Sequence, residues 1–247
     1  NWIVSEIKKE NNEVVKVELK PLNISPYCKP VFDRCSRVLI MSATILNAGA
    51  FCRTVGLDPD IVKFMQLESD FPLENRPIIS LDVAPLNYKN LQSAQVQDSV
   101  ARTVDKIMSF HENDKGIIHT TSYDQLNFIR NNISGINAQR LLETNPAKQR
   151  DQVIEQHICS VEPTVLISPS FHTGIDLKDN LSRFQIITKV PYPNMGDRWT
   201  NAKRKADHGW YYWQTALKLI QAYGRSIRSK DNWAKTYVLD STFVSFV

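Results

Sequence analysis

Cysteine and glycine are scarce in this sequence. It holds four cysteines and eight glycines in 247 residues, and no two cysteines form a CxxC pair. The five histidines are scattered and add no metal-ligand spacing beside the cysteines. We therefore expect no metal site in this segment, neither zinc nor iron–sulfur. The cysteines are expected to be reduced, buried thiols of an intracellular protein: Cys28, Cys35, Cys52 and Cys159.

Long apolar runs and a strong charge of one sign are also absent. No stretch approaches about 18 uninterrupted apolar residues, and no secretory hydrophobic region opens the chain. We expect no membrane partner and an intracellular protein that is not secreted, cytoplasmic in a prokaryote or nuclear in a eukaryote. The net charge of +4 is compatible with a polyanionic partner but is too weak to establish one.

Two motifs of nucleotide chemistry are missing. The sequence holds no GxxxxGK[ST] phosphate loop and no DEAH-like metal-binding box. The chain begins at "NWIVSE" without a methionine and ends at "STFVSFV", and we interpret it as a piece of a longer polypeptide. Residues 1–36 are expected to be a lead-in segment from a preceding domain, and 37–247 to form one domain.

The sequence does contain a regular alternation of short apolar runs and amphipathic stretches. This alternation predicts an α/β fold with a mainly parallel sheet and helices on both faces. The predicted strands are 12–24, 37–44, 76–84, 115–122, 163–170, 183–190 and 234–240. The predicted helices are 47–57, 94–112, 123–133, 145–158 and 210–229, with a short helix or helical turn at 27–36.

Small hydroxyl residues follow three of the predicted strands. In open parallel sheets, ligands bind at the carboxyl ends of strands, and hydroxyl and loop N–H groups there suit phosphates. Each signal is weak alone, because serine and threonine also cap helices and close turns. The candidates are Ser42 and Thr44 after the first strand, Thr120, Thr121 and Ser122 after the second, and Ser170 after the third, whose loop continues to Gly174 and Asp176.

A glutamine, a glycine and two arginines stand together in "QAYGRSIRS". Gln221, Gly224, Arg225 and Arg228 are spaced i, i+3, i+4 and i+7, which predicts one helical face. Two guanidinium forks on one face suit a phosphate, and the alternative is a solvated basic surface. Glycine inside a helix costs about 1 kcal/mol relative to alanine, which favours close approach of another body.

Taken together, these motifs resemble the second motor domain of superfamily 2 helicases. The segments "MSATI", "GIIHTTSYDQL", "SPSFHTGIDL" and "QAYGRSIRS" come in the order and spacing of the XPD/DinG-type DNA helicases, with XPD the closest. The resemblance covers about residues 37–243 and implies a RecA-like fold of the P-loop NTPase type without its own phosphate loop. The sequence departs from the family at Thr173, where glutamate is usual, and at Thr242, where arginine is frequent.

The resemblance implies the C-terminal motor domain of an ATP-dependent DNA helicase that acts in DNA repair. ATP and Mg²⁺ would then be held with the first RecA-like motor domain of the same polypeptide, and this chain alone would be inactive. An iron–sulfur cluster would belong to the N-terminal part that precedes this chain. Arg225 and Arg228 would act on the ATP phosphates, Arg228 as the arginine finger, while Gln221 would bridge the cleft.

The resemblance assigns the remaining candidates as well. Gly174 would let the backbone approach the nucleotide, and Asp176 would contact the ribose or orient Arg225, unless it only caps a helix. The other hydroxyl residues divide into DNA contacts, which are Thr120, Thr121, Ser122 and Ser170 on single-stranded DNA, and coupling residues, which are Ser42 and Thr44.

Two other functions fit the same motifs. One is another superfamily 2 translocase acting on RNA or DNA, because the arginine motif suits both substrates. The other is a degenerate RecA-like domain that serves as an interaction scaffold. Thr173 and Thr242 favour the scaffold weakly, whereas the retained Arg225 and Arg228 oppose it.

Overall fold

The computed structural model describes residues 2–8, 14–144, 150–171, 175–227 and 229–246. The chain divides into two compact units, each of which is described by itself. Unit 1 contains Asn1–Leu67 and Tyr192–Leu217, and unit 2 contains Glu68–Pro191 and Lys218–Val247. The expected boundary after residue 36 does not coincide with this division, and the assignment of 37–247 to one motor domain stays a prediction.

Unit 2 is built on a six-stranded sheet in which every strand pair is parallel. Strands β4 (Gly116–His119), β6 (Val165–Ser168) and β7 (Phe184–Ile187) consist entirely of buried residues, as expected for apolar runs in a parallel sheet with two covered faces. Five predicted strands are confirmed here, and β5 (Leu141–Glu143) is an addition. The strand order is β3 (Ile78–Ala84), β8 (Lys235–Asp240), β7 (Phe184–Ile187), β4 (Gly116–His119), β6 (Val165–Ser168) and β5 (Leu141–Glu143).

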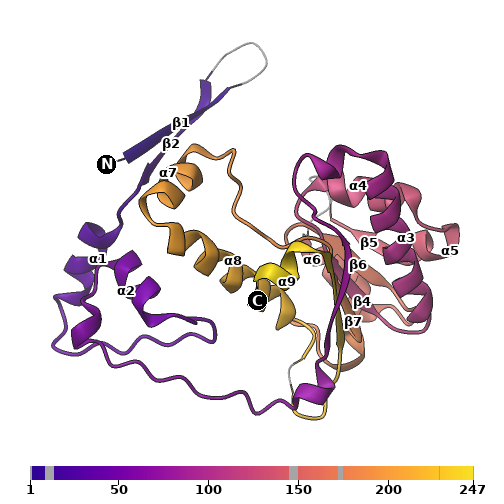
Figure 1. Ribbon diagram of the computed structural model, residues 1–247. Coiled ribbons are helices and arrows are strands. Elements are labelled where there is room, and N and C mark those ends of the chain that lie inside the picture. The colour runs from indigo at the N-terminus through magenta and orange to yellow at the C-terminus, as the bar shows by residue number, and fades with distance from the viewer. Residues whose placement is uncertain (1, 9–13, 145–149, 172–174, 228, 247) are drawn as a thin grey trace. The chain divides into compact units, whose positions relative to one another are not determined.

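Helices cover both faces of this sheet, which confirms the predicted α/β architecture. On one face, α3 (Ala94–Phe110) and α4 (Tyr123–Asn132) lie side by side (Figure 1) and pack on Ile118 and Ile167. Ile117 and Leu166, one position along the same strands, pack with α6 (Arg150–Cys159) in a second core. The other helical elements of unit 2 are η2 (Leu73–Asn75), η3 (Asn90–Gln92), α5 (Gly135–Arg140), η4 (Asp179–Leu181) and α9 (Thr242–Phe246).

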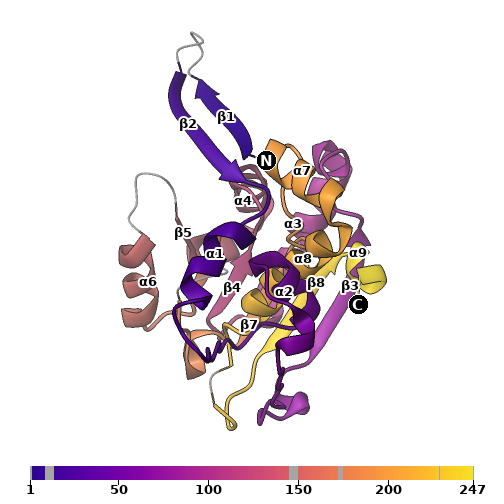
Figure 2. The same cartoon turned by 90° about the vertical axis from the view of Figure 1, so that its left-hand side faces the viewer.

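Unit 1 opens with an antiparallel hairpin of β1 (Trp2–Lys8) and β2 (Val14–Pro21), drawn as two paired arrows in Figure 2. The helix predicted at 47–57 is confirmed as α2 (Ala48–Val55). Asn47 caps it, since its Oδ1 accepts from the N–H of Ala50 at 2.8 Å, and Gly56 ends it with a φ of 78°. The unit also contains α1 (Ser25–Phe32), η1 (Pro59–Ile61), α7 (Arg198–Ala206) and the first part of α8 (His208–Tyr223), which ends in unit 2.

The expected strand at 37–44 and the expected burial of all four cysteines are wrong. Residues 37–44 form no strand, and the side chains of Leu39 and Met41 are 82% and 81% exposed. A buried parallel strand needs neighbours for its backbone N–H and C=O groups, and no described strand pairs with this segment. The cysteines are not uniformly buried either, because Cys35, just after α1, and Cys159, the last residue of α6, are exposed.

Candidate functional site

The hydroxyl candidates of unit 2 meet at the carboxyl edge of its sheet. Strands β4 and β6 are neighbours with His119 opposite Ser168, and the N–H of Thr120 donates to the carbonyl of Ser168 at 3.3 Å. The structure therefore brings residues 120–122 next to the loop that holds Ser170, as expected for positions that follow parallel strands. Thr120 is itself buried, and its hydroxyl has no hydrogen-bond partner within the described part of the chain.

These hydroxyl groups differ in what they can donate. The side-chain Oε1 of Gln125 accepts from the N–H of Thr121 at 2.8 Å and from its hydroxyl at 3.2 Å, so Thr121 already uses both donors. Ser122 caps α4, since its Oγ accepts from the N–H of Gln125 at 3.2 Å, and its hydroxyl hydrogen can still go to another acceptor. The first N–H groups of a helix lack acceptors within the helix. Ser122 and the first turn of α4 are thus the better donors for an anion.

A chain of three hydroxyls lies on the neighbouring strands. Oγ1 of Thr144 lies 2.6 Å from Oγ of Ser168, which in turn lies 2.9 Å from Oγ of Ser170. Thr144 directly follows β5 and was not among the predicted site residues, because the three-residue β5 falls between the predicted helices 123–133 and 145–158, where no strand was expected. The apolar pair Leu141 and Leu142 is the one signal that could have indicated it.

The arginine motif crosses the end of α8: Gln221 lies within the helix, whereas Gly224 and Arg225 follow it. The helix predicted to reach residue 229 ends at Tyr223, and the N–H groups of Gly224 and Arg225 donate to Ile220 and Ala222 carbonyls at 2.9 and 3.2 Å. The predicted continuous helical face is therefore wrong, since glycine is a weak helix former and the helix stops before it. Gln221 is half-buried in the last turn, and Arg228 lies outside the described residues.

Arg225 nevertheless contacts the loop of the "GID" motif. Its Nη1 donates to the carbonyl of Ile175 at 3.1 Å. The adjacent Asp176 is exposed, and its carboxylate lies 3.5 Å from Nζ of Lys178. Asp176 does not cap a helix, because η4 begins at Asp179 with Lys178 as its N-cap residue. The helix-cap alternative is thus wrong, and Gly174 lies outside the described residues.

Ser42 and Thr44 belong to unit 1, whereas the other described candidates belong to unit 2. The N–H of Thr44 donates to Oγ of Ser42 at 3.2 Å, which closes a turn after the exposed apolar run. One pocket of about 570 Å³ is lined by residues 39–46, apart from Thr44, and by residues 63–67. The coupling role of Ser42 and Thr44 stays a prediction.

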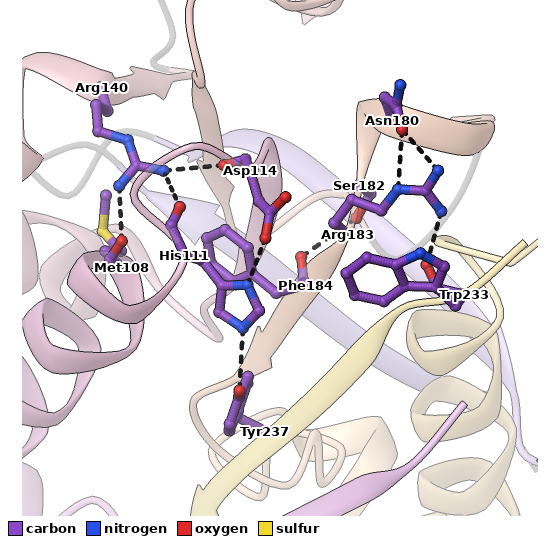
Figure 3. A network of polar contacts seen from close by, with 10 residues as sticks. All are labelled: Met108, His111, Asp114, Arg140, Asn180, Ser182, Arg183, Phe184, Trp233 and Tyr237. Carbon is purple, nitrogen blue, oxygen red and sulfur yellow. Dashed lines mark hydrogen bonds and ion pairs between the residues drawn. The ribbon is translucent and has the colours of Figure 1, made fainter. Parts of the chain in front are cut away.

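The amino edge of the unit 2 sheet carries a polar network that no sequence motif indicates (Figure 3). The guanidinium of Arg140 donates to four backbone carbonyls at 2.7 to 2.9 Å. The ring of His111 lies between the carboxylate of Asp114 at 2.8 Å and the hydroxyl of Tyr237 at 3.0 Å, stacked on Phe184. Burial lowers the pKa of His111, and hydrogen bonding to Asp114 opposes that shift. The network joins the loops that lead into the strands.

More than half of this chain matches a known protein family. A model described as the helicase C-terminal domain matches residues 105–245, which is more than half of the chain. The chain belongs to the helicase C-terminal domain family. The matched part of this domain contains both hydroxyl segments of the carboxyl edge, together with the arginine motif.

The helicase C-terminal domain has relatives among helicases of the XPD/DinG type. The ATP-dependent DNA helicase DinG of Photobacterium profundum is 24% identical over 263 residues, covering 99% of this chain and 37% of DinG. Two solved structures share its fold. An XPD helicase has a TM-score of 0.72 at 17% identity and covers 92% of this chain and 43% of that chain. An apo XPD has a TM-score of 0.70 at 17% identity, and the match covers 93% of this chain and 49% of that chain.

These comparisons confirm the expected RecA-like second-domain fold and the resemblance to XPD/DinG-type helicases. The chain spans less than half of the length of each of these three relatives. Within the described ranges, no helix combines the length and apolar character that a membrane span requires.

Proposed function

We propose that this domain is the C-terminal motor domain of an ATP-dependent DNA helicase of the XPD type that acts in DNA repair. The observation that carries the proposal is the meeting of residues 120–122 and Ser170 at one sheet edge, on the neighbouring strands β4 and β6. Donors from Ser122, Ser170 and the first turn of α4 suit the phosphate oxygens that every nucleotide presents. Single-stranded DNA would therefore bind without sequence preference and more weakly as salt rises.

ATP and Mg²⁺ would bind with the first motor domain of the same polypeptide, and this chain alone would be inactive. Arg225 and Arg228 would stabilise the charge of the transferred phosphoryl group, with Arg228 as the finger. Gln221 would bridge to the nucleotide or to the opposing domain. The hydrogen bond from Arg225 to Ile175 supports this arrangement, because it holds a guanidinium beside the loop of Asp176. Gly174 would allow close approach of the nucleotide, and an iron–sulfur cluster would belong to the preceding part of the polypeptide.

The exposed apolar segments of unit 1 favour a contact surface for a partner. Leu39, Met41 and Met65 are largely exposed, and all three line the pocket of about 570 Å³. Covering apolar surface gains about 25 cal/mol per Å², so a contiguous exposed patch favours a partner. We assign this cover to the first motor domain, with Ser42 and Thr44 coupling the two.

ATP turnover of the intact protein in the presence of single-stranded DNA tests the proposal. We expect Arg228→Ala to lower turnover about a thousandfold, or about 4 kcal/mol of transition-state stabilisation, with DNA affinity within about twofold of the parent. Arg228→Lys is expected to be nearly as damaging, because an ammonium cannot reproduce the guanidinium fork.

Arg102→Ala is the matched control, because Arg102 is an exposed arginine on α3 whose partner is Asp98 at 2.9 Å. Turnover of the Arg228 variants within about threefold of the parent would contradict the finger role. If RNA and not DNA stimulates ATP turnover of the unsubstituted protein, the RNA translocase is favoured. If the unsubstituted protein shows no ATP turnover, the interaction scaffold is favoured.

A further inference from the structure

Thr144, Ser168 and Ser170 form a hydroxyl chain that runs from the interior of unit 2 to the proposed DNA edge. Thr144 and Ser168 are only 4% and 1% exposed, whereas Ser170 is half-buried. The chain thus has a buried end at Thr144 and an accessible end at Ser170. Thr144 is too deep to contact DNA itself, so any effect it has on binding must pass through its neighbours.

Ser168 gives this chain a direction. A serine Oγ has one hydrogen to donate and two lone pairs that accept. One lone pair of Ser168 accepts the N–H of Ser170 at 3.0 Å. The other lone pair and the hydrogen remain for the hydroxyls of Thr144 at 2.6 Å and Ser170 at 2.9 Å. Ser168 therefore accepts from one neighbour and donates to the other.

The two possible directions differ in where the last hydrogen lies. If Thr144 donates to Ser168 and Ser168 donates to Ser170, the remaining hydrogen is on Ser170, where solvent or a ligand can accept it. In the opposite direction it is on Thr144, at the buried end, where no other group of the described residues accepts it and an unsatisfied donor is costly. The outward direction is favoured for this reason, and each hydrogen bond in it polarises the next.

We propose that Thr144 is a positioning residue for nucleic-acid binding. Through Ser168, it directs the hydroxyl hydrogen of Ser170 outward to a phosphate oxygen of single-stranded DNA. This inference rests on the proposed function, because Ser170 is the group that contacts the phosphate. An anion at Ser170 would reinforce the outward direction, since it accepts the last hydrogen.

The test is an equilibrium titration of the protein with a labelled single-stranded oligothymidylate at several salt concentrations. Ser170→Ala removes the outer donor and is expected to weaken binding about tenfold. Thr144→Val keeps the shape but removes the inner donor, and we expect a loss of about threefold. Thr144→Ser keeps the hydroxyl and should bind within about twofold of the parent. The double variant of Thr144→Val and Ser170→Ala should bind no more weakly than Ser170→Ala alone.

Thr164→Val is the matched control. Thr164 is a buried threonine just before β6, and its hydroxyl lies 2.8 Å from Nδ1 of His157, away from the carboxyl edge. It should bind DNA like the parent even if its melting temperature falls. If Thr144→Val lowers the melting temperature, Ser168→Ala serves as a second variant because it interrupts the same hydroxyl chain. It should weaken DNA binding by the same factor of about three.

The outcomes separate this inference from the function on which it rests. Parent-like binding by Thr144→Val and Ser168→Ala beside a weakened Ser170→Ala would overturn the hydroxyl chain and leave the DNA edge in place. Additive losses in the double variant would also overturn it, because Thr144 would then act independently of Ser170. A parent that shows no salt-dependent DNA binding would overturn the proposed function and this inference with it.

Discussion

The two edges of the unit 2 sheet use their polar groups in opposite ways. At the amino edge, Arg140 donates to four backbone carbonyls. Both ring nitrogens of His111 have partners there, as Figure 3 shows. At the carboxyl edge, the hydroxyl of Thr120 and the amide nitrogen of Gln125 are buried without a partner among the described residues. Ser122 there keeps a hydroxyl hydrogen for an outside acceptor.

This difference indicates where stability and where binding reside. A satisfied buried network contributes to stability, and removing one member leaves its partners unsatisfied. Donors that remain at the carboxyl ends of parallel strands are the ones a ligand can use. We therefore expect substitutions at the amino edge to lower stability without affecting DNA binding. Substitutions at the carboxyl edge should weaken DNA binding with little effect on stability.

The largest effect on stability is expected for Arg140→Met. Methionine keeps most of the aliphatic volume but removes a donor from four carbonyls, of which only that of His111 has another recorded donor among the described residues, the N–H of Asp114 at 3.1 Å. The free energy of unfolding should therefore fall by about 3 kcal/mol. DNA affinity of the folded protein should stay within about twofold. Urea unfolding measures the first quantity, and oligonucleotide titration measures the second. Arg102→Met, at an exposed pair, should change stability by less than about 0.5 kcal/mol. Equal free energies of unfolding for Arg140→Met and Arg102→Met would show that Arg140 does not stabilise the amino edge.

The pH dependence of stability gives a second test of the amino edge. His157 accepts from Thr164 at Nδ1 and lies 2.8 Å from the carbonyl of Leu181 at Nε2, and burial lowers its pKa from 6.5 to about 4. The unfolded state therefore binds more protons. The stability that the neutral ring contributes above pH 6.5 is lost as the pH falls toward 4, by about 2–3 kcal/mol.

His157→Gln should remove this part of the pH dependence, measured by urea unfolding at several pH values. His208→Gln, at an exposed histidine, should retain it. If the parent and His157→Gln lose stability in parallel between pH 6.5 and 4, His157 does not carry the effect.

The smallest effect separates two adjacent hydroxyls of the carboxyl edge. Ser122→Gly removes a hydrogen that can reach phosphate and should weaken single-stranded DNA binding about fivefold. Glycine is tolerated at an N-cap, so stability should fall by only a few tenths of a kcal/mol. Thr121→Val should change affinity by less than about twofold, because Gln125 already accepts both of its donors. A larger loss for Thr121→Val would reverse this assignment.

Much of the fold and part of the candidate site follow from the sequence. Runs such as Val165–Ser168 are short, apolar and bounded by polar residues, so they predict buried parallel strands. The rule that ligands bind at the carboxyl ends of such strands then places Thr120 and Ser170 at one edge. No long-range information is needed for either step.

The remainder depends on tertiary neighbours that the sequence pattern does not reveal. The run at 37–44 has the composition of a buried strand, but no described strand pairs with it. Strand β5 has only three residues, too few for a periodic signal, and Thr144 was missed with it. Helix α8 stops before Gly224, which breaks the predicted arginine face. Arg140 binds backbone carbonyls, for which no side-chain motif exists.

An amide chemical-shift titration of the protein with single-stranded DNA shows which sheet edge binds DNA. We expect shifts at Ser122, Ser170 and the first turn of α4, which diminish as salt rises because binding releases counterions. Amides around Arg140 and Tyr237 at the amino edge should not move. Shifts confined to the amino edge, or shifts at the carboxyl edge that are indifferent to salt, would rule out phosphate binding at the carboxyl edge.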